Sequence, residues 1–275
     1  MIAFSYLGGK FRMIDDLLPI LPECDHYCEP FAGSLSILLN RRPSPIETAN
    51  DLNGDLVNFF RVLRGRNSRR LVMGLRLTPY SREEFETAWH PCDDPVERAR
   101  RFYVRITMDI AKGGRKADKS WGSNVKYCSG EHAYVPLGFL KKVNGLDQVV
   151  ERLRKVQIEN RPAIKVIQKY DNPNTLYYVD PPYLHETRTS KKDYAHEMSI
   201  DDHVNLSKVL NNAKGMVCIS GYDAPVMQEL YPANKWKQIK FPSKQVAMSK
   251  GNGLVRQECV WINYDPFKGQ LKLFS

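Results

Sequence analysis

A short apolar stretch that ends in two consecutive prolines constrains this chain most. Residues 176–179 read Leu-Tyr-Tyr-Val, and such aromatic and β-branched side chains are typical of a buried strand. Pro181 and Pro182 follow Asp180 directly, and proline can continue neither a strand ladder nor a helix. The strand must therefore stop and expose Asp180. Ligands of open α/β sheets bind at the carboxyl ends of the strands, so Asp180 and Tyr183 are expected at a binding site.

These groups suit a planar ring that carries an exocyclic amino group. The lone pair of such an amino group is delocalised into the ring, so the nitrogen is a poor nucleophile. If Asp180 and the carbonyl of Pro181 accept the two amino hydrogens, they oppose this delocalisation, and Tyr183 offers a face on which the ring can stack. The alternative is a turn that only ends a core strand, with Asp180 capping the next element.

The same four residues resemble a known catalytic motif. Asp180, Pro181, Pro182 and Tyr183 are similar to the motif of amino-methyltransferases, in the Asp form of the Dam-type DNA adenine-N6 methyltransferases. The resemblance implies that these four residues are catalytic. It also implies S-adenosylmethionine as the methyl donor, with Asp180 near it, and as the acceptor an adenine rotated out of double-stranded DNA.

Two glycines and a lysine precede a helical pattern of apolar residues at 13–21. Glycines in this position let backbone N–H groups come close to an anion, and Lys10 adds a positive charge; a solvated turn is the alternative. The Dam-type family has a similar Gly-Gly-Lys segment that contacts the cofactor, often with an aromatic residue before it. The resemblance implies that Tyr6, Gly9 and Lys10 contact the cofactor or the active site.

A strand, a tight turn and the start of a helix are predicted over residues 26–39, as in the first βα unit of a nucleotide-binding sheet. Gly33 allows close backbone approach at the start of that helix. The segment resembles the Glu-Pro-Phe-x-Gly motif of the same family, in which many members have a second glycine a residue or so after the place of Ser34. The resemblance implies cofactor contacts for Glu29, Pro30, Phe31, Gly33 and Ser34.

Asp51 follows a second predicted strand, at residues 46–49. Its distance from the glycine turn is that at which α/β nucleotide folds place the acid that holds ribose hydroxyls. The family has a similar acid, so Asp51 is expected to bind the cofactor. Asp51 is alternatively the N-cap of a helix over 52–63, and the two roles do not exclude one another.

The apolar pattern becomes helical over residues 55–156, with basic residues crowded between the apolar positions. We therefore expect an α/β fold, in which a Rossmann-like methyltransferase sheet formed by residues 1–54 and 157–275 carries a mostly helical insertion. The resemblance places the DNA target-recognition domain in this insertion. Its last helix is predicted at 143–156, and the tail is predicted to form an antiparallel hairpin.

Two basic, Gly-containing loops, at residues 112–124 and 244–252, are candidates for contacts with DNA. An aromatic side chain such as Trp121 can wedge or stack at a displaced base. A solvated face is the alternative for any such run of charge. The predicted DNA-binding residues are Arg115, Lys116, Lys119, Trp121, Asn124, Lys244 and Lys250.

Composition agrees with a polyanionic partner, since the net charge is +10 and the pI is about 9.2. The opening residues are too short for a secretory signal and no later run is long and apolar enough to span a bilayer. Cysteines and histidines lack the spacing of a metal site. We therefore expect a cytoplasmic protein that joins the nucleoid when it binds DNA, with reduced thiols, no metal and a monomeric state.

Three other functions were weighed. An RNA or protein amino-methyltransferase more often has Asn in the place of Asp180 and lacks a basic insertion here. A DNA-binding homologue without catalysis is disfavoured because Asp51, Asp180 and Tyr183 are all present. A nicotinamide oxidoreductase is disfavoured because the G-x-G-x-x-G fingerprint is missing.

Overall fold

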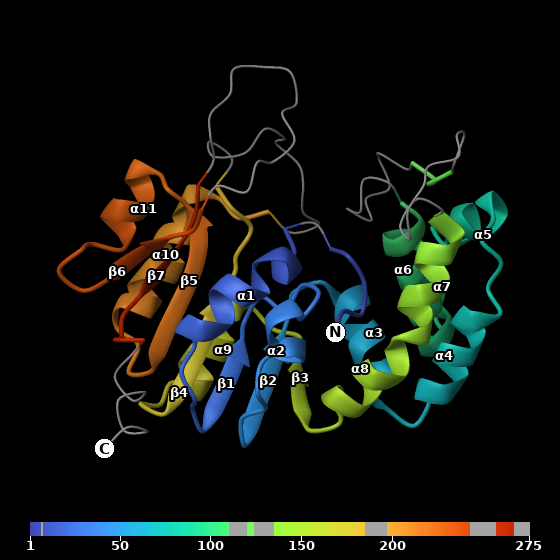
Figure 1. Cartoon of the computed structure of the whole chain (residues 1–275), viewed down its shortest axis with the longest axis horizontal. Helices are drawn as coiled ribbons and strands as arrows, with labels where there is room; N and C mark the ends of the chain where they lie inside the picture. The colour runs from blue at the N-terminus through green and yellow to red at the C-terminus, as the bar shows by residue number, and fades with distance from the viewer. Residues whose placement is uncertain (7, 110–119, 124–134, 185–196, 243–256, 267–275) are drawn as a thin grey trace.

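The computed structural model describes residues 1–6, 8–109, 120–123, 135–184, 197–242 and 257–266 (Figure 1). Its centre is a seven-stranded sheet in the order β3-β2-β1-β4-β5-β7-β6. Strands β1 to β5 run parallel, whereas β7 is antiparallel to both β5 and β6. The strands are β1 (His26–Glu29), β2 (Ile46–Asn50), β3 (Val156–Glu159), β4 (Thr175–Val179), β5 (Met216–Tyr222), β6 (Lys237–Lys240) and β7 (Glu258–Ile262). The expected Rossmann-like α/β fold and the closing antiparallel hairpin are thus confirmed.

The order of the strands reverses between β1 and β4. The chain runs outward from β1 through β2 to β3 and then returns to place β4 on the other side of β1. A reversal of this kind separates the connections above and below the sheet and opens a crevice at the carboxyl ends of the two strands. The residues that follow β1, β2 and β4 therefore meet at one place.

Alternation along the strands gives the sheet two cores. Tyr27 and Tyr178 point into one cluster of buried side chains, while their neighbours Cys28 and Tyr177 point into the other. Both faces are apolar because helices cover both, as is usual for parallel sheets (Figure 1). Helices on the first face include α1 (Ile14–Leu17) and α2 (Ser36–Asn40), and those on the second are α9 (Ala163–Tyr170), α10 (Ile200–Asn211) and α11 (Pro225–Leu230).

The helices between β2 and β3 lie beside β3, at the edge of the sheet opposite to β6 (Figure 1). They are α3 (Gly54–Arg64), α4 (Ser68–Arg76), α5 (Arg82–Thr87), α6 (Pro95–Met108), α7 (Val135–Asn144) and α8 (Leu146–Leu153). The single helix predicted over 143–156 is wrong, because Gly145 separates two helices and its N–H closes the first by donating to the carbonyls of Lys141 and Lys142. In the described ranges no helix combines the length and apolar character that a membrane span requires.

One buried cluster runs without a break from the sheet into these helices. Phe4 lies at its centre, with ring centroids 5.5 Å from Phe59 of α3 and 6.4 Å from Tyr103 of α6. Tyr27 and Tyr178 of the sheet belong to the same cluster. The helical region therefore shares its core with the sheet, and the division into residues 1–54 with 157–275 and residues 55–156 stays a prediction.

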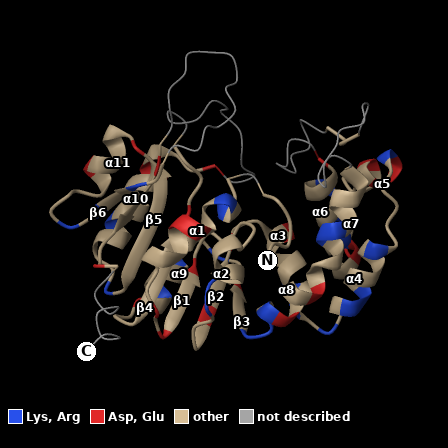
Figure 2. Cartoon of the chain, in the orientation of Figure 1, with Lys and Arg blue, Asp and Glu red and all other residues tan. Residues whose placement is uncertain are grey.

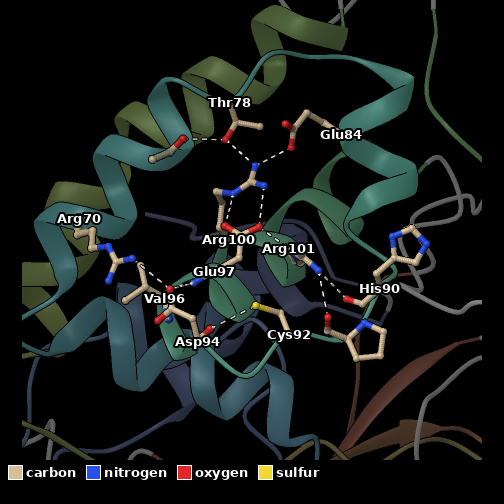
Figure 3. A network of polar contacts seen from close by, with 12 residues as sticks. Arg70, Thr78, Glu84, His90, Cys92, Asp94, Val96, Glu97, Arg100 and Arg101 are labelled. Atoms are coloured by element: carbon tan, nitrogen blue, oxygen red, sulfur yellow. Dashed lines mark hydrogen bonds and ion pairs between the residues drawn. The ribbon is translucent and has the colours of Figure 1, made fainter.

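Basic and acidic residues are interspersed along these helices (Figure 2), and several of the arginines form ion pairs with acids of the same region. Asp55 accepts from Arg98 at 2.6 Å and from Arg105 at 2.7 Å. Figure 3 shows the neighbouring network, in which Glu97 binds Arg100 at 2.7 Å and Arg101 at 2.8 Å. Much of the basic character seen in the sequence is thus neutralised inside the helical region.

A buried ion pair joins α8 to the sheet. Arg152 is 11% exposed and Glu47 of β2 is 2% exposed, and the guanidinium donates to the carboxylate at 2.8 Å. The same guanidinium donates to the carbonyl of Leu38 at 2.6 Å. Removing the arginine would leave Glu47 buried with Arg41 as its nearest remaining cation, at 3.7 Å.

We expect Arg152→Leu to lower the free energy of unfolding by about 3 kcal/mol, because a carboxylate would stay buried without its main partner. Urea unfolding followed by circular dichroism measures this change. Arg154→Leu is the matched control, since Arg154 is exposed and pairs with exposed Glu151, and it should cost less than about 0.5 kcal/mol. Equal effects of the two substitutions would contradict the expected role of the buried pair.

Candidate active site

The predicted strand stop occurs where expected, because β4 ends at Val179 and Asp180 follows at the carboxyl edge of the sheet. A residue of α10 holds the next part of the turn, since Nε2 of buried His203 donates to the carbonyl of Pro182 at 2.9 Å. Tyr183 is buried beyond them. The turn is therefore rigidly placed, with Asp180 at its start.

The N-terminal segment crosses this edge of the sheet. Gly8 has φ 73°, and the N–H of Gly9 donates to the carbonyl of Tyr6 at 3.0 Å. A Cβ at Gly9 would lie 3.0 Å from that carbonyl oxygen and 3.2 Å from Oγ of Ser34, so any larger residue would have to push these neighbours aside. This close approach brings the segment against the turn after β1, and Lys10 follows as the first residue of the 3-10 helix η1 (Lys10–Met13).

Lys10 and Asp180 form an ion pair that is largely shielded from solvent. The Nζ–Oδ1 distance is 2.9 Å, and the side chains are 6% and 19% exposed. The ammonium also donates to the carbonyl of Gly8 at 3.1 Å and lies 4.7 Å from the centroid of the Tyr183 ring. The predicted cofactor residue Lys10 and the predicted catalytic residues Asp180 and Tyr183 are thus in direct contact.

Tyr183 is held by a residue that the sequence did not indicate. Its hydroxyl donates to Oε2 of Glu258 at 2.8 Å, and its ring meets that of Tyr222 edge-on at 4.8 Å. Burial raises the pKa of Glu258, and nearby Asp180 raises it further, while Lys10 and the Tyr183 hydroxyl lower it. Glu258 therefore belongs to the same electrostatic group as the Lys10–Asp180 pair.

The turn after β1 is shaped by buried polar contacts. Oε1 of Glu29 accepts from the hydroxyl of Tyr27 at 2.9 Å and from the N–H of Leu38 at 2.7 Å, which ties the end of the strand to α2. Gly33 has φ 47°, and Leu35 has φ 54°. Leu35 thus adopts the left-handed conformation that favours glycine, near where family members have their second glycine, and its side chain is fully buried.

Asp51 links this turn to the end of β2. Its carboxylate accepts from the N–H of Gly33 at 3.0 Å and from that of Asn53 at 2.8 Å. The alternative role as a helix N-cap is wrong, because Asn53 caps α3 by accepting from the N–H groups of Asp55 and Leu56. A carboxylate oxygen can accept more than one hydrogen bond, so Asp51 can also hold hydroxyls of a ligand.

Buried Asn50 fixes the ends of three strands relative to one another. Its amide donates to the carbonyl of Pro30 after β1 at 2.8 Å and to that of Arg161 after β3 at 2.9 Å. Its side-chain oxygen accepts from the N–H of Arg161 at 2.9 Å. The sequence analysis did not single out Asn50, although a polar residue at the end of an apolar strand could have indicated it.

These elements enclose a pocket of about 290 Å³ at the carboxyl ends of β1, β2 and β4. Of the predicted cofactor residues, only Pro30 does not line it. Those that do are Tyr6, Gly9, Lys10, Glu29, Phe31, Gly33, Ser34, Asp51 and Asp180. The pocket wall also includes Leu52, Ile164, Met198 and Leu206, which the sequence analysis missed because they follow no recognisable motif.

Of the predicted DNA-binding residues, the structure describes Trp121. Its ring packs 5.9 Å from that of Tyr80, and the Arg82 guanidinium lies 4.7 Å above it. Binding of DNA by Trp121 stays a prediction. Arg115, Lys116, Lys119, Asn124, Lys244 and Lys250 lie outside the described residues.

Comparison with known families decides the assignment. The family model for D12 class N6 adenine-specific DNA methyltransferases matches residues 6–248, which include every motif described above. The chain belongs to this family. Membership confirms the expected enzyme class, an adenine-specific DNA methyltransferase that uses S-adenosylmethionine, and makes DNA the substrate.

Individual relatives agree with membership of the D12 class. A DNA adenine methylase from Salmonella typhi is 25% identical over 251 residues, which cover 86% of each chain. The DNA N-6-adenine-methyltransferase of Escherichia phage P1 is 24% identical over 90% of this chain and 33% of that protein. Among solved structures, the rRNA methyltransferase aviRa from Streptomyces viridochromogenes covers 96% of this chain and 88% of its own, with 13% identity and a TM-score of 0.41, too low to bear on the fold or substrate of this D12 methyltransferase.

The buried carboxyl of Glu29 should make the free energy of unfolding of this methyltransferase depend on pH. Burial raises the pKa of Glu29 from 4.5 to about 8, against the lowering effects of the Tyr27 hydroxyl, the Leu38 N–H and Arg41. The folded protein then binds this proton more tightly than the unfolded chain does. The free energy of unfolding should therefore fall as pH rises from about 5 to 8, by at most about 1.4 kcal/mol per pH unit.

Glu29→Gln keeps an acceptor for both donors but cannot titrate. Relative to this variant, the wild type should lose stability between pH 5 and pH 8 in urea unfolding experiments. Glu151→Gln, on the exposed face of α8, should follow the wild type. Parallel stability curves for the wild type and Glu29→Gln would show that Glu29 does not titrate in this range.

Proposed function

We propose that this enzyme binds S-adenosylmethionine in the pocket and transfers its methyl group to N6 of an adenine that has left the stack of double-stranded DNA. The observation that carries the proposal is the placement of two acids in one pocket. Asp51 lies at the end of β2, and Asp180 lies at the end of β4 beside an aromatic ring. One acid suits the hydroxyls of a ribose, and the other suits an amino group.

The side chains in the cofactor half of the pocket match the chemical groups of S-adenosylmethionine. Asp51 is oriented by the N–H groups of Gly33 and Asn53, so it can accept from ribose hydroxyls. Gly9 lines the pocket, and Phe31 with Ile164 offers apolar surface for an adenine ring. When bound, S-adenosylmethionine supplies an electrophilic sulfonium methyl group.

The turn that follows β4 would activate the acceptor; Asp180 and Pro182 of this turn line the pocket, whereas Pro181 and Tyr183 do not. Asp180 and the carbonyl of Pro181 would accept the two hydrogens of the adenine amino group and localise its lone pair on nitrogen, while Tyr183 stacks on the ring. In the structure Lys10 donates to Asp180 and lies over the face of Tyr183. The incoming amino group must therefore share Asp180 with Lys10 or displace it.

This mechanism requires double-stranded DNA to open at the target adenine. N6 of adenine is paired inside the duplex, so rotation of the base out of the stack costs a few kcal/mol, offset by stacking on Tyr183 and by contacts with the DNA backbone. The net charge of +10 favours such contacts. We propose that residues 55–156 read the target and that residues 1–54 and 157–275 bind the cofactor. We also propose that the protein acts as a monomer.

Asp180→Ala should lower the rate of methyl transfer at least about 100-fold, because it removes an acceptor of the amino group. The affinity for S-adenosylmethionine, measured by isothermal titration calorimetry, should change little. Glu23→Ala is the control, since Glu23 is exposed before β1, pairs with exposed Arg42 and lies outside residues 55–156. Wild-type turnover by Asp180→Ala would exclude the proposed role of Asp180.

Asp51→Ala should have the opposite effect. Loss of charge-assisted hydrogen bonds to ribose should weaken binding of S-adenosylmethionine roughly 10- to 100-fold. Asp51→Asn can accept from only one of the Gly33 and Asn53 N–H groups, because these bind different carboxylate oxygens. The melting temperature of both variants therefore has to be measured beside the affinity, to separate ribose binding from loop structure. Wild-type affinity in both variants would leave Asp51 with only its structural contacts.

The function itself is tested by incubating the protein with tritiated S-adenosylmethionine and separate pools of duplex DNA, single-stranded DNA, RNA and protein. Digestion of duplex DNA should yield labelled N6-methyladenine. Label only in another pool would assign a different amino substrate, and label in none would indicate a protein that binds without catalysis.

A further inference from the structure

The hydroxyl of Tyr183 is held by a residue that lies much later in the chain. It donates at 2.8 Å to Oε2 of Glu258, which lies 75 residues later and begins β7. Both side chains are shielded from solvent, Tyr183 almost completely. A hydrogen bond to a carboxylate in such surroundings is stronger than a neutral one and is sensitive to direction.

Two further contacts define where the Tyr183 ring lies. Tyr222 meets it edge-on at 4.8 Å with an interplanar angle of 77°. Tyr222 and Glu258 are partners in the register of β5 and β7, so the sheet fixes both residues relative to one another. Lys10 occupies the space 4.7 Å from the ring centroid. The ring thus rests on one side chain of this strand pair, and its hydroxyl is bound by the other.

We propose that Glu258 is a positioning residue for methyl transfer: it holds the Tyr183 hydroxyl and so sets the plane on which the target adenine stacks. The inference rests on the proposed function. An aromatic ring with an unbound hydroxyl can swing about its side-chain torsions, and the stacked adenine would follow it. Because the adenine nitrogen must line up with the methyl group, small errors of orientation slow the reaction.

The electrostatic setting allows charge and hydrogen bonding to be separated. Lys10 and Asp180 both act on Glu258, so its removal also changes the field at the ion pair. Glu258→Gln removes the charge but keeps an oxygen that can accept from Tyr183. Glu258→Leu removes both. Tyr183→Phe keeps the stacking face and removes only the hydroxyl.

The experiment measures kcat, the KM for duplex DNA, the affinity for S-adenosylmethionine and the melting temperature in each variant. Glu258→Leu should lower kcat about 10- to 100-fold with cofactor affinity near the wild-type value. Tyr183→Phe should show a similar loss, and the double variant should be no slower than either single variant. Glu258→Gln should restore most of the rate. Glu23→Leu, at an exposed position before β1 and outside residues 55–156, is the control.

Four results would overturn the inference: wild-type kcat in Glu258→Leu, losses that multiply in the double variant, equal losses in Glu258→Gln and Glu258→Leu, or a fall in cofactor affinity and melting temperature that accounts for the slower turnover. The wild-type rate in the same assay separates the two hypotheses. If the wild type labels adenine and Glu258→Leu is equally fast, only this inference fails. If the wild type does not label adenine, the proposed function fails as well.

Discussion

The ion pair between Lys10 and Asp180 connects the first residues of the chain with the end of β4. Taking either charge out of water alone would cost several kcal/mol, so each side chain depends on the other for its position. Phe4, buried between sheet and helices, anchors the segment that delivers Lys10. Any group that enters to bind Asp180 therefore meets a carboxylate that already has Lys10 as its partner.

The sequence predicts the parts of the site that obey local rules. Prolines end β4 at Asp180, and glycine is favoured at positions 9 and 33 by close approach and a positive φ, respectively. The cap named from the sequence, Asp51, was wrong because Asn53, an equally good cap two residues later, caps α3. Glu258 was missed because its contact depends on the register of β7 against β5, which no local pattern encodes.

The arginines of the helical region show why composition is a weak guide to a binding surface. Arg98 and Arg105 both bind Asp55, and Arg100 and Arg101 both bind Glu97 (Figure 3). Each partly exposed pair contributes little stability. Together, however, they decide which positive charges remain available to phosphates. A count of basic residues cannot distinguish a guanidinium that faces a partner carboxylate from one that faces solvent.

The unbroken core between sheet and helices bears on how specificity can change. Phe59 and Tyr103 of the helices pack on Phe4, in the same cluster as Tyr27 of the sheet, and Arg152 of α8 reaches Glu47 of β2. Excising residues 55–156, or exchanging them as a unit, would expose apolar side chains of the sheet that these helices now cover. If residues 55–156 read the target, as proposed, new target sequences are more accessible through substitutions on the surface of this region than through transplantation of the whole of it.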